Sequence, residues 1–375
     1  GYSGLTPRRF GEEVRRLAAA DGIPREQLIL GGDHIGPHPW RFGAAGYAMD
    51  KATALAAACA RAGYQKLHLD TAAPCRSDPL ETDGTLGIDI VSRRAARLCQ
   101  AAEQGAATQG FPPPWYVIGS DVPPPGGERT GAATPPSDPL KLGETIAAHR
   151  RAFQRAGLAD AWQRVFAVVV CTGADFSPRS IHPYDTRRVQ PLVARIGQEG
   201  LVFEAHSTDF QAPEALARMV TDRFGILKVG PALTYAMREV LFALAAIEAD
   251  WLAGCAKIRV SRLPEVMDRL MVDDPTYWQA YYPGTAVEQA ELRRHAYSDR
   301  IRYYWFHPRA RSAVKRLMHN LKCHPPPQPL IDRHLPQFAA LIREDRLSRD
   351  PEHIVLERIG RVAQTYARAC RLSPP

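Results

Sequence analysis

The sequence predicts an α/β fold of the (β/α)8 barrel type, built on a parallel sheet. Six short apolar, β-prone runs each end on polar residues, and they occupy 28–34, 66–70, 116–121, 165–173, 201–206 and 226–230. Segments with helical periodicity lie between them, so strands and helices alternate along the chain. This alternation requires a parallel sheet with right-handed crossovers. A barrel is favoured over an open doubly wound sheet because no G-x-G-x-x-G turn follows any of the runs.

The helices between the runs are predicted from their periodicity and from the glycines that follow them. They cover 50–62, 88–104, 142–156 and 213–224, and the glycines are Gly63, Gly105, Gly157 and Gly225. A glycine readily adopts the left-handed conformation that closes many helices. The run 165–170 is almost entirely aliphatic, as expected of a strand covered on both faces.

The strand signals fade after about residue 253, and helices dominate the rest of the chain. We therefore expect a barrel domain over 1–253 and a helical extension packed on it over 254–375. A stretch rich in proline and glycine, 122–139, follows the third strand and is predicted to be a long exposed loop.

Composition excludes several classes of protein. The 375 residues are 45% hydrophobic, enough for a large core. The formal charge of +8 comes from dispersed basic residues without a nucleic-acid-binding motif, so no nucleic-acid partner is expected. No apolar run is long enough for a membrane span, and no signal peptide is recognisable, so a cytoplasmic protein without membrane contact is predicted. Seven scattered cysteines without a C-x-x-C pair predict neither a zinc ribbon nor a disulfide framework.

A parallel barrel brings the C-terminal ends of its strands together on one face. Polar residues at those ends are therefore candidates for catalysis in one cavity: Asp33, Asp70, Asp121, Glu204 and Lys228. Strand alternation sends Glu204 and His206 to the same side, where inward-facing charge needs a ligand, a metal or a partner residue.

Two of these interpretations stay open at the level of sequence. By the same alternation His68 and Asp70 share a face, and a simple internal ion pair would satisfy both. Lys228 could neutralise a phosphate or pair with Glu204.

Phosphate-binding candidates follow the later strands. Ser207, Thr208 and Gly230 lie on loops of the kind where barrels hold phosphate through backbone N–H groups. Arg300 or Arg302 could reach a phosphate bidentately, or could anchor the helical extension.

Several longer motifs closely resemble the GatZ/KbaZ family. They are GGDHIGP (31–37), KLHLD (66–70), VPPPGG (122–127), FEAHSTD (203–209), LKVGPALTYAMREVLFALAAIE (227–248) and YSDRIRYYW (297–305). Members are the so-called non-catalytic subunits of class II D-tagatose-1,6-bisphosphate aldolase, sometimes labelled tagatose-6-phosphate kinases. Since they normally begin with two further barrel strands, we expect an eight-stranded barrel of which this chain lacks the first two strands.

The resemblance to class II aldolases also implies a metal site. It makes Asp33 the proton-transfer residue and His34 and His206 metal ligands, with zinc or manganese as the divalent ion to expect. Where those aldolases carry another zinc histidine, this chain has Cys171-Thr172. A catalytic zinc normally has three protein ligands, so the resemblance implies no aldolase activity by this chain alone unless Asp175, Glu204 or Asp121 substitutes for the missing ligand.

The function implied is that of an accessory subunit that binds a catalytic class II aldolase subunit. It would support cleavage of the sugar phosphate to glycerone phosphate and glyceraldehyde 3-phosphate in galactitol or N-acetylgalactosamine breakdown; self-association is a further expectation. The alternative is a metal-dependent 4-epimerase of a ketohexose or its phosphate, because both reactions begin by removing the proton of a metal-bound hydroxyl. A kinase is disfavoured because no P-loop motif is present. Whether the chain is an enzyme by itself stays open.

Overall fold

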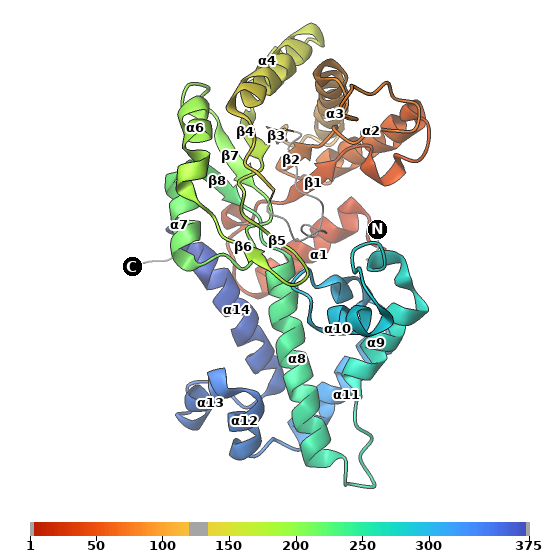
Figure 1. Cartoon of the computed structure of the whole chain (residues 1–375), viewed down its shortest axis with the longest axis vertical. Helices are drawn as coiled ribbons and strands as arrows, with labels where there is room; N and C mark the ends of the chain where they lie inside the picture. Colours follow the sequence, from red (N-terminus) through yellow and green to blue (C-terminus); the bar gives the residue numbers. More distant parts are fainter. Residues whose placement is uncertain (1–3, 120–133, 373–375) are drawn as a thin grey trace.

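The computed structural model describes residues 4–119 and 134–372 (Figure 1). Six parallel strands form one sheet in the order β1-β2-β3-β4-β7-β8. Their bounds are β1 (Gly31–Ile35), β2 (Lys66–Leu69), β3 (Trp115–Ile118), β4 (Val165–Val170), β7 (Val202–Ala205) and β8 (Phe224–Leu227). All six runs predicted as strands are strands.

The sheet is strongly curled. Lys228, directly after β8, contacts the carboxylate of Asp33 on β1, so the two edge strands approach each other. In a flat sheet, five strand spacings of about 4.8 Å would hold those edges about 24 Å apart. The sheet is therefore a half-barrel. The predicted α/β class with a parallel sheet is confirmed, whereas a complete eight-stranded barrel stays a prediction.

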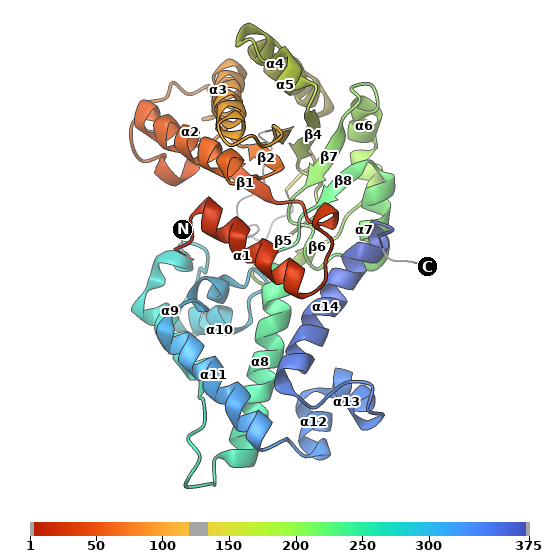
Figure 2. The same ribbon diagram turned by 180° about the vertical axis from the view of Figure 1, so that it is seen from behind.

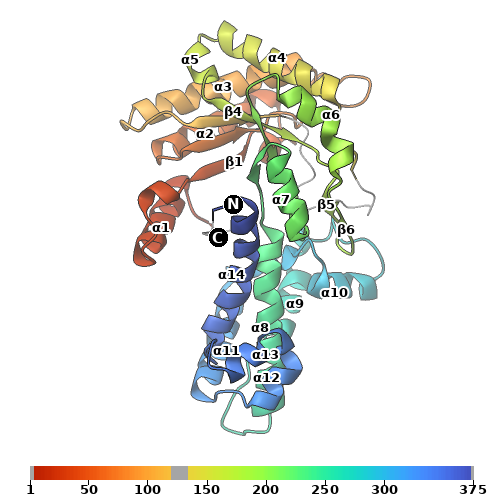
Figure 3. The same ribbon diagram turned by 90° about the vertical axis from the view of Figure 1, so that its left-hand side faces the viewer.

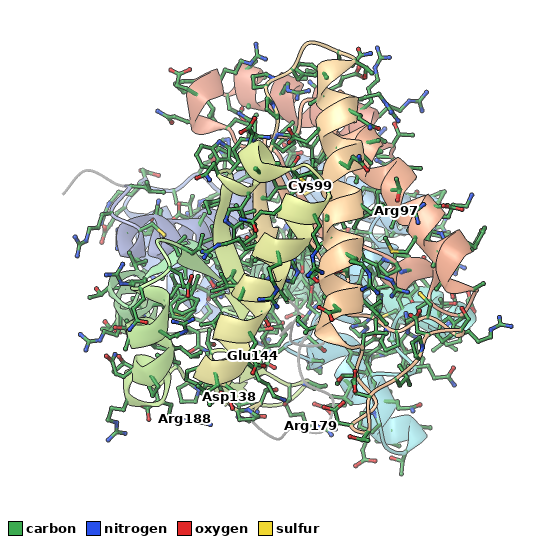
Figure 4. All side chains as sticks on the ribbon, turned by 90° about the horizontal axis from the view of Figure 1, so that it is seen from above. Arg97, Cys99, Asp138, Glu144, Arg179 and Arg188 are labelled. Carbon is green, nitrogen blue, oxygen red and sulfur yellow. The ribbon has the colours of Figure 1, made fainter. Side chains whose placement is uncertain are left out.

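Helices cover the convex face of the sheet (Figures 1 and 4). They are α2 (Ala45–Arg61), α3 (Ile88–Ala107), α4 (Pro139–Arg155), α5 (Ala159–Trp162), α6 (Thr186–Ile196) and α7 (Pro213–Thr221). On α3, Cys99 is completely buried, whereas Arg97 pairs at the surface with Asp50 of α2 (Nη2–Oδ1 2.6 Å; Figure 4). The main apolar core lies between these helices and the sheet.

Glycine closes two of the four predicted helices. Gly63 and Gly157 follow α2 and α4 with φ near +70°. The prediction for Gly105 is wrong: it lies inside α3, where a Cβ would come within 2.6 Å of the Ala57 carbonyl oxygen, so packing against α2 explains the glycine. Gly225 belongs to β8 rather than to a helix end.

Several elements were not predicted. The helix α1 (Pro7–Ala20) precedes β1 and docks on the end of α2 through Arg15, which donates to the carbonyl of Ala62 (2.9 Å; Figure 2). A two-stranded hairpin, β5 (Asp175–Phe176) and β6 (Ile181–His182), follows β4. The helix α6 escaped detection because it contains Pro191.

The chain after β8 is helical and has a core of its own. Its helices are α8 (Pro231–Leu252), α9 (Leu263–Asp273), α10 (Ala286–His295), α11 (Pro308–Cys323), α12 (Gln328–His334), α13 (Pro336–Arg343) and α14 (Pro351–Ala369). This core includes Val240 and Leu244 of α8, so α8 joins the sheet to the extension; the boundary at 253/254 stays a prediction. The last helix, α14, returns along α8 to the sheet (Figure 3).

Two further expectations concern the loop and the membrane. Most of the predicted loop 122–139 lies outside the described residues. Within the described part of the chain, no helix has both the length and the apolar character needed to cross a membrane.

Candidate functional site

The site lies on the concave face of the sheet, at the C-terminal ends of the strands. His68 of β2 is in register with Val117 of β3, and Glu204 of β7 with Val169 of β4. Residues in register on neighbouring strands project from the same face, so His68 and Glu204 lie in one row with a small apolar cluster that includes both valines. Alternation adds Lys66 and His206 to that face.

Asp33 connects three elements of the site. Its Oδ1 lies 3.3 Å from Nδ1 of His68 and is contacted by Nζ of Lys228. Its Oδ2 lies 3.6 Å from Nε2 of His34. Burial by itself would raise the pKa of Asp33, but the hydrogen bond from His68 and the charge of Lys228 outweigh it and hold the pKa well below its usual range. Asp33 is therefore a carboxylate at every physiological pH.

Glu204 is completely buried between two lysines. Its Oε1 lies 2.6 Å from Nζ of Lys228, and its Oε2 is contacted by Nζ of Lys66. Against the effect of burial, the hydrogen bond with His206 and both lysines hold the pKa of Glu204 well below its usual range. Burial lowers the pKa of Lys228, while Asp33 and Glu204 act in the opposite direction; two carboxylates in direct contact favour the ammonium form.

His206 is neutral at physiological pH. Burial lowers the pKa of its imidazole to about 4, although Glu204 raises it. Nε2 lies 2.6 Å from Nζ of Lys228 and 3.1 Å from Oε1 of Glu204. A neutral imidazole nitrogen is either a donor or an acceptor, so Nε2 satisfies one of these two contacts at a time.

His34 completes a group of three imidazoles. Its ring centroid lies 4.9 Å from that of His206 and 5.3 Å from that of His68. Its Nδ1 lies 2.8 Å from Oδ2 of Asp70. The ion pair of His68 with Asp70 that the sequence left open does not form: Asp70 binds His34, and His68 binds Asp33.

A cavity of about 560 Å³ opens onto this cluster. Asp33, His34, His206, Ser207 and Lys228 line it, together with Lys66, Asp209, Gly230 and Arg302. The aromatic ring of Phe176, from the hairpin, forms another part of its wall.

The predicted phosphate-binding residues occupy different places. Ser207 lines the cavity with a left-handed φ of 56°. Thr208 is buried, and its Oγ1 donates to the carbonyl of Lys228 (2.5 Å). The N–H of Gly230 donates to Oδ1 of Asp209 (2.9 Å). Tyr366 of α14 donates to the carbonyl of Thr208 (2.7 Å), which fixes this loop to the last helix.

Arg300 and Arg302 of the helical extension lie in different surroundings. Arg302 lines the cavity and donates to Tyr303 Oη (2.9 Å). Arg300 is buried away from it, with its guanidinium 3.3 Å from the ring centroid of Tyr281. Asp121 lies outside the described residues.

Four residues could hold a divalent metal ion. Donor atoms of Asp33, His68, Glu204 and His206 all lie within 4.8 Å of one another. Nε2 of His68 is buried without a hydrogen-bond partner in the described part of the chain, which suits an imidazole available to a ligand. Carboxylates and imidazoles are donors that zinc and manganese accept, so the residues fit such an ion. Sequence reasoning expected His34 in this role and did not assign one to His68, because His68 precedes the strand end.

A curled parallel sheet with carboxylates and imidazoles at the C-terminal ends of its strands defines an α/β protein of TIM-like fold. Within that class, the chain belongs to the D-tagatose-1,6-bisphosphate aldolase subunit GatZ/KbaZ-like family, whose model matches residues 1–371. It is 39% identical over 371 residues to D-tagatose-1,6-bisphosphate aldolase subunit GatZ of Klebsiella pneumoniae, which covers 99% of this chain and 86% of that protein. A crystal structure described as a probable tagatose 6 phosphate kinase from Sinorhizobium meliloti 1021 is 40% identical, with a TM-score of 0.87 over 99% of this chain and 89% of that one.

Proposed function

We propose that this chain is the accessory, non-catalytic subunit of a class II D-tagatose-1,6-bisphosphate aldolase. The observation that carries the proposal is its similarity, over 99% of its length, to a relative named as a subunit of that aldolase. In this role it associates with a catalytic aldolase subunit in the cytoplasm and supports cleavage of the sugar bisphosphate to glycerone phosphate and glyceraldehyde 3-phosphate.

The charges of the cavity support a sugar phosphate as its ligand. Lys66, Lys228 and Arg302 line the cavity wall; Lys66 and Lys228 pair with Glu204 and Asp33, so Arg302 is the cation best placed for a charge-assisted hydrogen bond to a phosphate. The carboxylate of Asp33 and the imidazole of His34 are suited to sugar hydroxyls. Ser207, Gly230 and Arg302 are the predicted phosphate-binding residues that line the cavity, and the N–H of Gly230 already donates to Asp209.

The end of β4 supports a non-catalytic role. Cys171, which stands where the resemblance places a zinc histidine, is buried, and its backbone N–H donates to Oγ of Ser137 (2.8 Å). Among the described residues, β4 contributes no donor atom to the group formed by Asp33, His68, Glu204 and His206, the four-donor group. If a metal ion binds, Asp33, His68, Glu204 and His206 would hold it, and it would polarise a sugar oxygen as a Lewis acid.

The test is an aldolase assay on tagatose 1,6-bisphosphate with this chain, with a catalytic class II subunit, and with both. We expect no appreciable turnover by this chain alone and a gain in activity or half-life of the catalytic subunit in the mixture, with the two chains co-eluting in size-exclusion chromatography. Light scattering on this chain alone measures its self-association. Metal-dependent cleavage by the isolated chain that is lost in His34→Ala would contradict the proposal.

A 4-epimerase of a ketohexose or ketohexose phosphate is the second candidate. The observation in its favour is the intact group of carboxylates and imidazoles, with a neutral His206 able to accept a proton. The variant His206→Ala separates the two functions. It should leave partner-supported aldolase activity largely intact if the chain is an accessory subunit, and it should abolish tagatose–fructose interconversion if the chain is an epimerase.

A further inference from the structure

The ammonium group of Lys228 lies at the centre of the four-donor group. Its Nζ contacts Oδ1 of Asp33 and lies 2.6 Å from both Oε1 of Glu204 and Nε2 of His206. The fourth donor residue, His68, binds the same oxygen of Asp33 through Nδ1 (3.3 Å). Three of the four donors therefore converge on one point, and a primary ammonium occupies it.

Among the four donor residues and the two lysines that contact them, the formal charges balance without a metal. Asp33 and Glu204 supply two negative charges, and Lys228 and Lys66 supply two positive ones. The two lysines are not equivalent, because Lys66 contacts only the outer oxygen of Glu204, Oε2, whereas Lys228 lies among the donors. A divalent ion bound by the same donors would sit within a few ångströms of the ammonium, where like charges repel strongly.

We propose that Lys228 is a tethered cation that takes the place of a divalent metal in this site. Metal and ammonium compete for the same oxygen and nitrogen atoms. The wild-type chain therefore binds metal weakly, although it keeps the four donor residues Asp33, His68, Glu204 and His206. The proposal concerns the donor set alone and is independent of association with an aldolase.

The unpaired nitrogen of His68 is a second observation that points the same way. His68 is fully buried, its Nδ1 faces Asp33, and its Nε2 has no partner in the described part of the chain. An ammonium has three N–H donors; Lys228 donates to Asp33, contacts Nε2 of His206 and forms an ion pair with Glu204, and none of these contacts reaches Nε2 of His68. The donor set therefore offers one more ligand than the lysine can satisfy, whereas a metal ion accepts four or more.

A simple structural ion pair makes a different prediction. If Lys228 only neutralises carboxylates, its removal leaves buried charge and a damaged fold. If it substitutes for a metal, its removal creates a metal site, and added metal restores the thermal stability that the ammonium supplied.

The experiment is calorimetric titration of Zn²⁺ and Mn²⁺ into chelator-treated full-length protein, with thermal unfolding measured in parallel. Lys228→Met keeps the length of the side chain and removes its charge. We expect one ion per chain, bound at least about 100-fold more tightly than by the wild type. The ion should raise the unfolding temperature of the variant more than that of the wild type.

Two controls assign the effect to this site. Lys66→Met removes a cation that contacts the same carboxylate from outside and should increase affinity much less. Lys228→Met combined with His68→Ala should lose the tight binding, which excludes surface histidines as its source.

Three outcomes would overturn the proposal. The first is a wild-type chain that binds one ion with a dissociation constant of about 1 μM or below and loses that binding in His68→Ala. The second is a folded Lys228→Met, or Lys228→Gln if the methionine variant does not fold, without a gain in metal affinity. The third is an equal gain in Lys66→Met. The wild-type titration needs no substitution at Lys228, so it tests the proposal even if both variants fail to fold.

Discussion

Replacing Glu204 by glutamine tests whether the buried charges of the site balance one another. The change keeps the shape of the side chain but removes the negative charge shared by Lys66 and Lys228. The Glu204 side chain is 0% exposed, and those of the lysines are 15% and 19% exposed. Removing one partner of a buried ion pair costs about 3–5 kcal/mol. Both lysines keep some contact with water, so we expect the lower end, a loss of about 3 kcal/mol of unfolding free energy.

Urea unfolding at pH 7 in metal-free buffer, followed by circular dichroism, measures this loss. The matched control is Glu291→Gln, which breaks an exposed pair with Arg179 (2.5 Å) and should cost less than about 1 kcal/mol. Adding Lys66→Met to Glu204→Gln should cost less than the sum of the two single changes by about 1 kcal/mol or more, because one unpaired cation is removed. A Glu204→Gln variant within about 0.5 kcal/mol of the wild type would refute the reasoning.

Three further predictions concern positions outside the four-donor group. Burial lowers the pKa of His149 to about 4 from 6.5, so its contribution to stability should be complete above pH 6.5 and should fall by about 3 kcal/mol as the pH drops to 4; His149→Leu should flatten this part of the pH–stability curve. Gly105→Ala should destabilise the fold by about 2 kcal/mol in urea unfolding, because the new Cβ would meet the Ala57 carbonyl at 2.6 Å, and unchanged stability would show that α2 and α3 separate easily. Tyr366→Phe removes a hydrogen bond to Thr208 and should cost about 1 kcal/mol, with faster amide exchange in the loop after β7; exchange at the wild-type rate would contradict the contact.

The strands could be predicted from the sequence because each is a short apolar run bounded by turn residues. Helix ends were less accessible, since Gly105 looks like a terminator in sequence and is explained only by its contact with Ala57. The helix α6 was missed because a proline inside a helix is a local signal against it, which tertiary packing of Val189, Leu192 and Ile196 overrides.

The site could be anticipated only in part. Asp33, Glu204 and Lys228 were selected as strand-end residues, and the structure brings their charged groups into contact. The place of His68 depends on the curl of the sheet, which brings β1 and β2 opposite β7 and β8 and which no periodicity encodes. The positions of Arg300 and Arg302 depend on how the helical extension folds back: Arg300 is buried over Tyr281, whereas Arg302 lines the cavity.

The hydrogen bond between Tyr366 and Thr208 also determines when, during synthesis, the loop after β7 can be fixed to α14. The two residues are 158 positions apart, so the loop that carries Ser207 receives this hydrogen bond from a helix synthesised much later. At about 5–20 residues per second, a ribosome needs about 8–30 s to make the intervening chain. During that interval the half-barrel can form on the nascent chain while its ligand cavity is unfinished. The loop that carries Ser207 therefore gains its hydrogen bond to Tyr366 only after α14 has been synthesised.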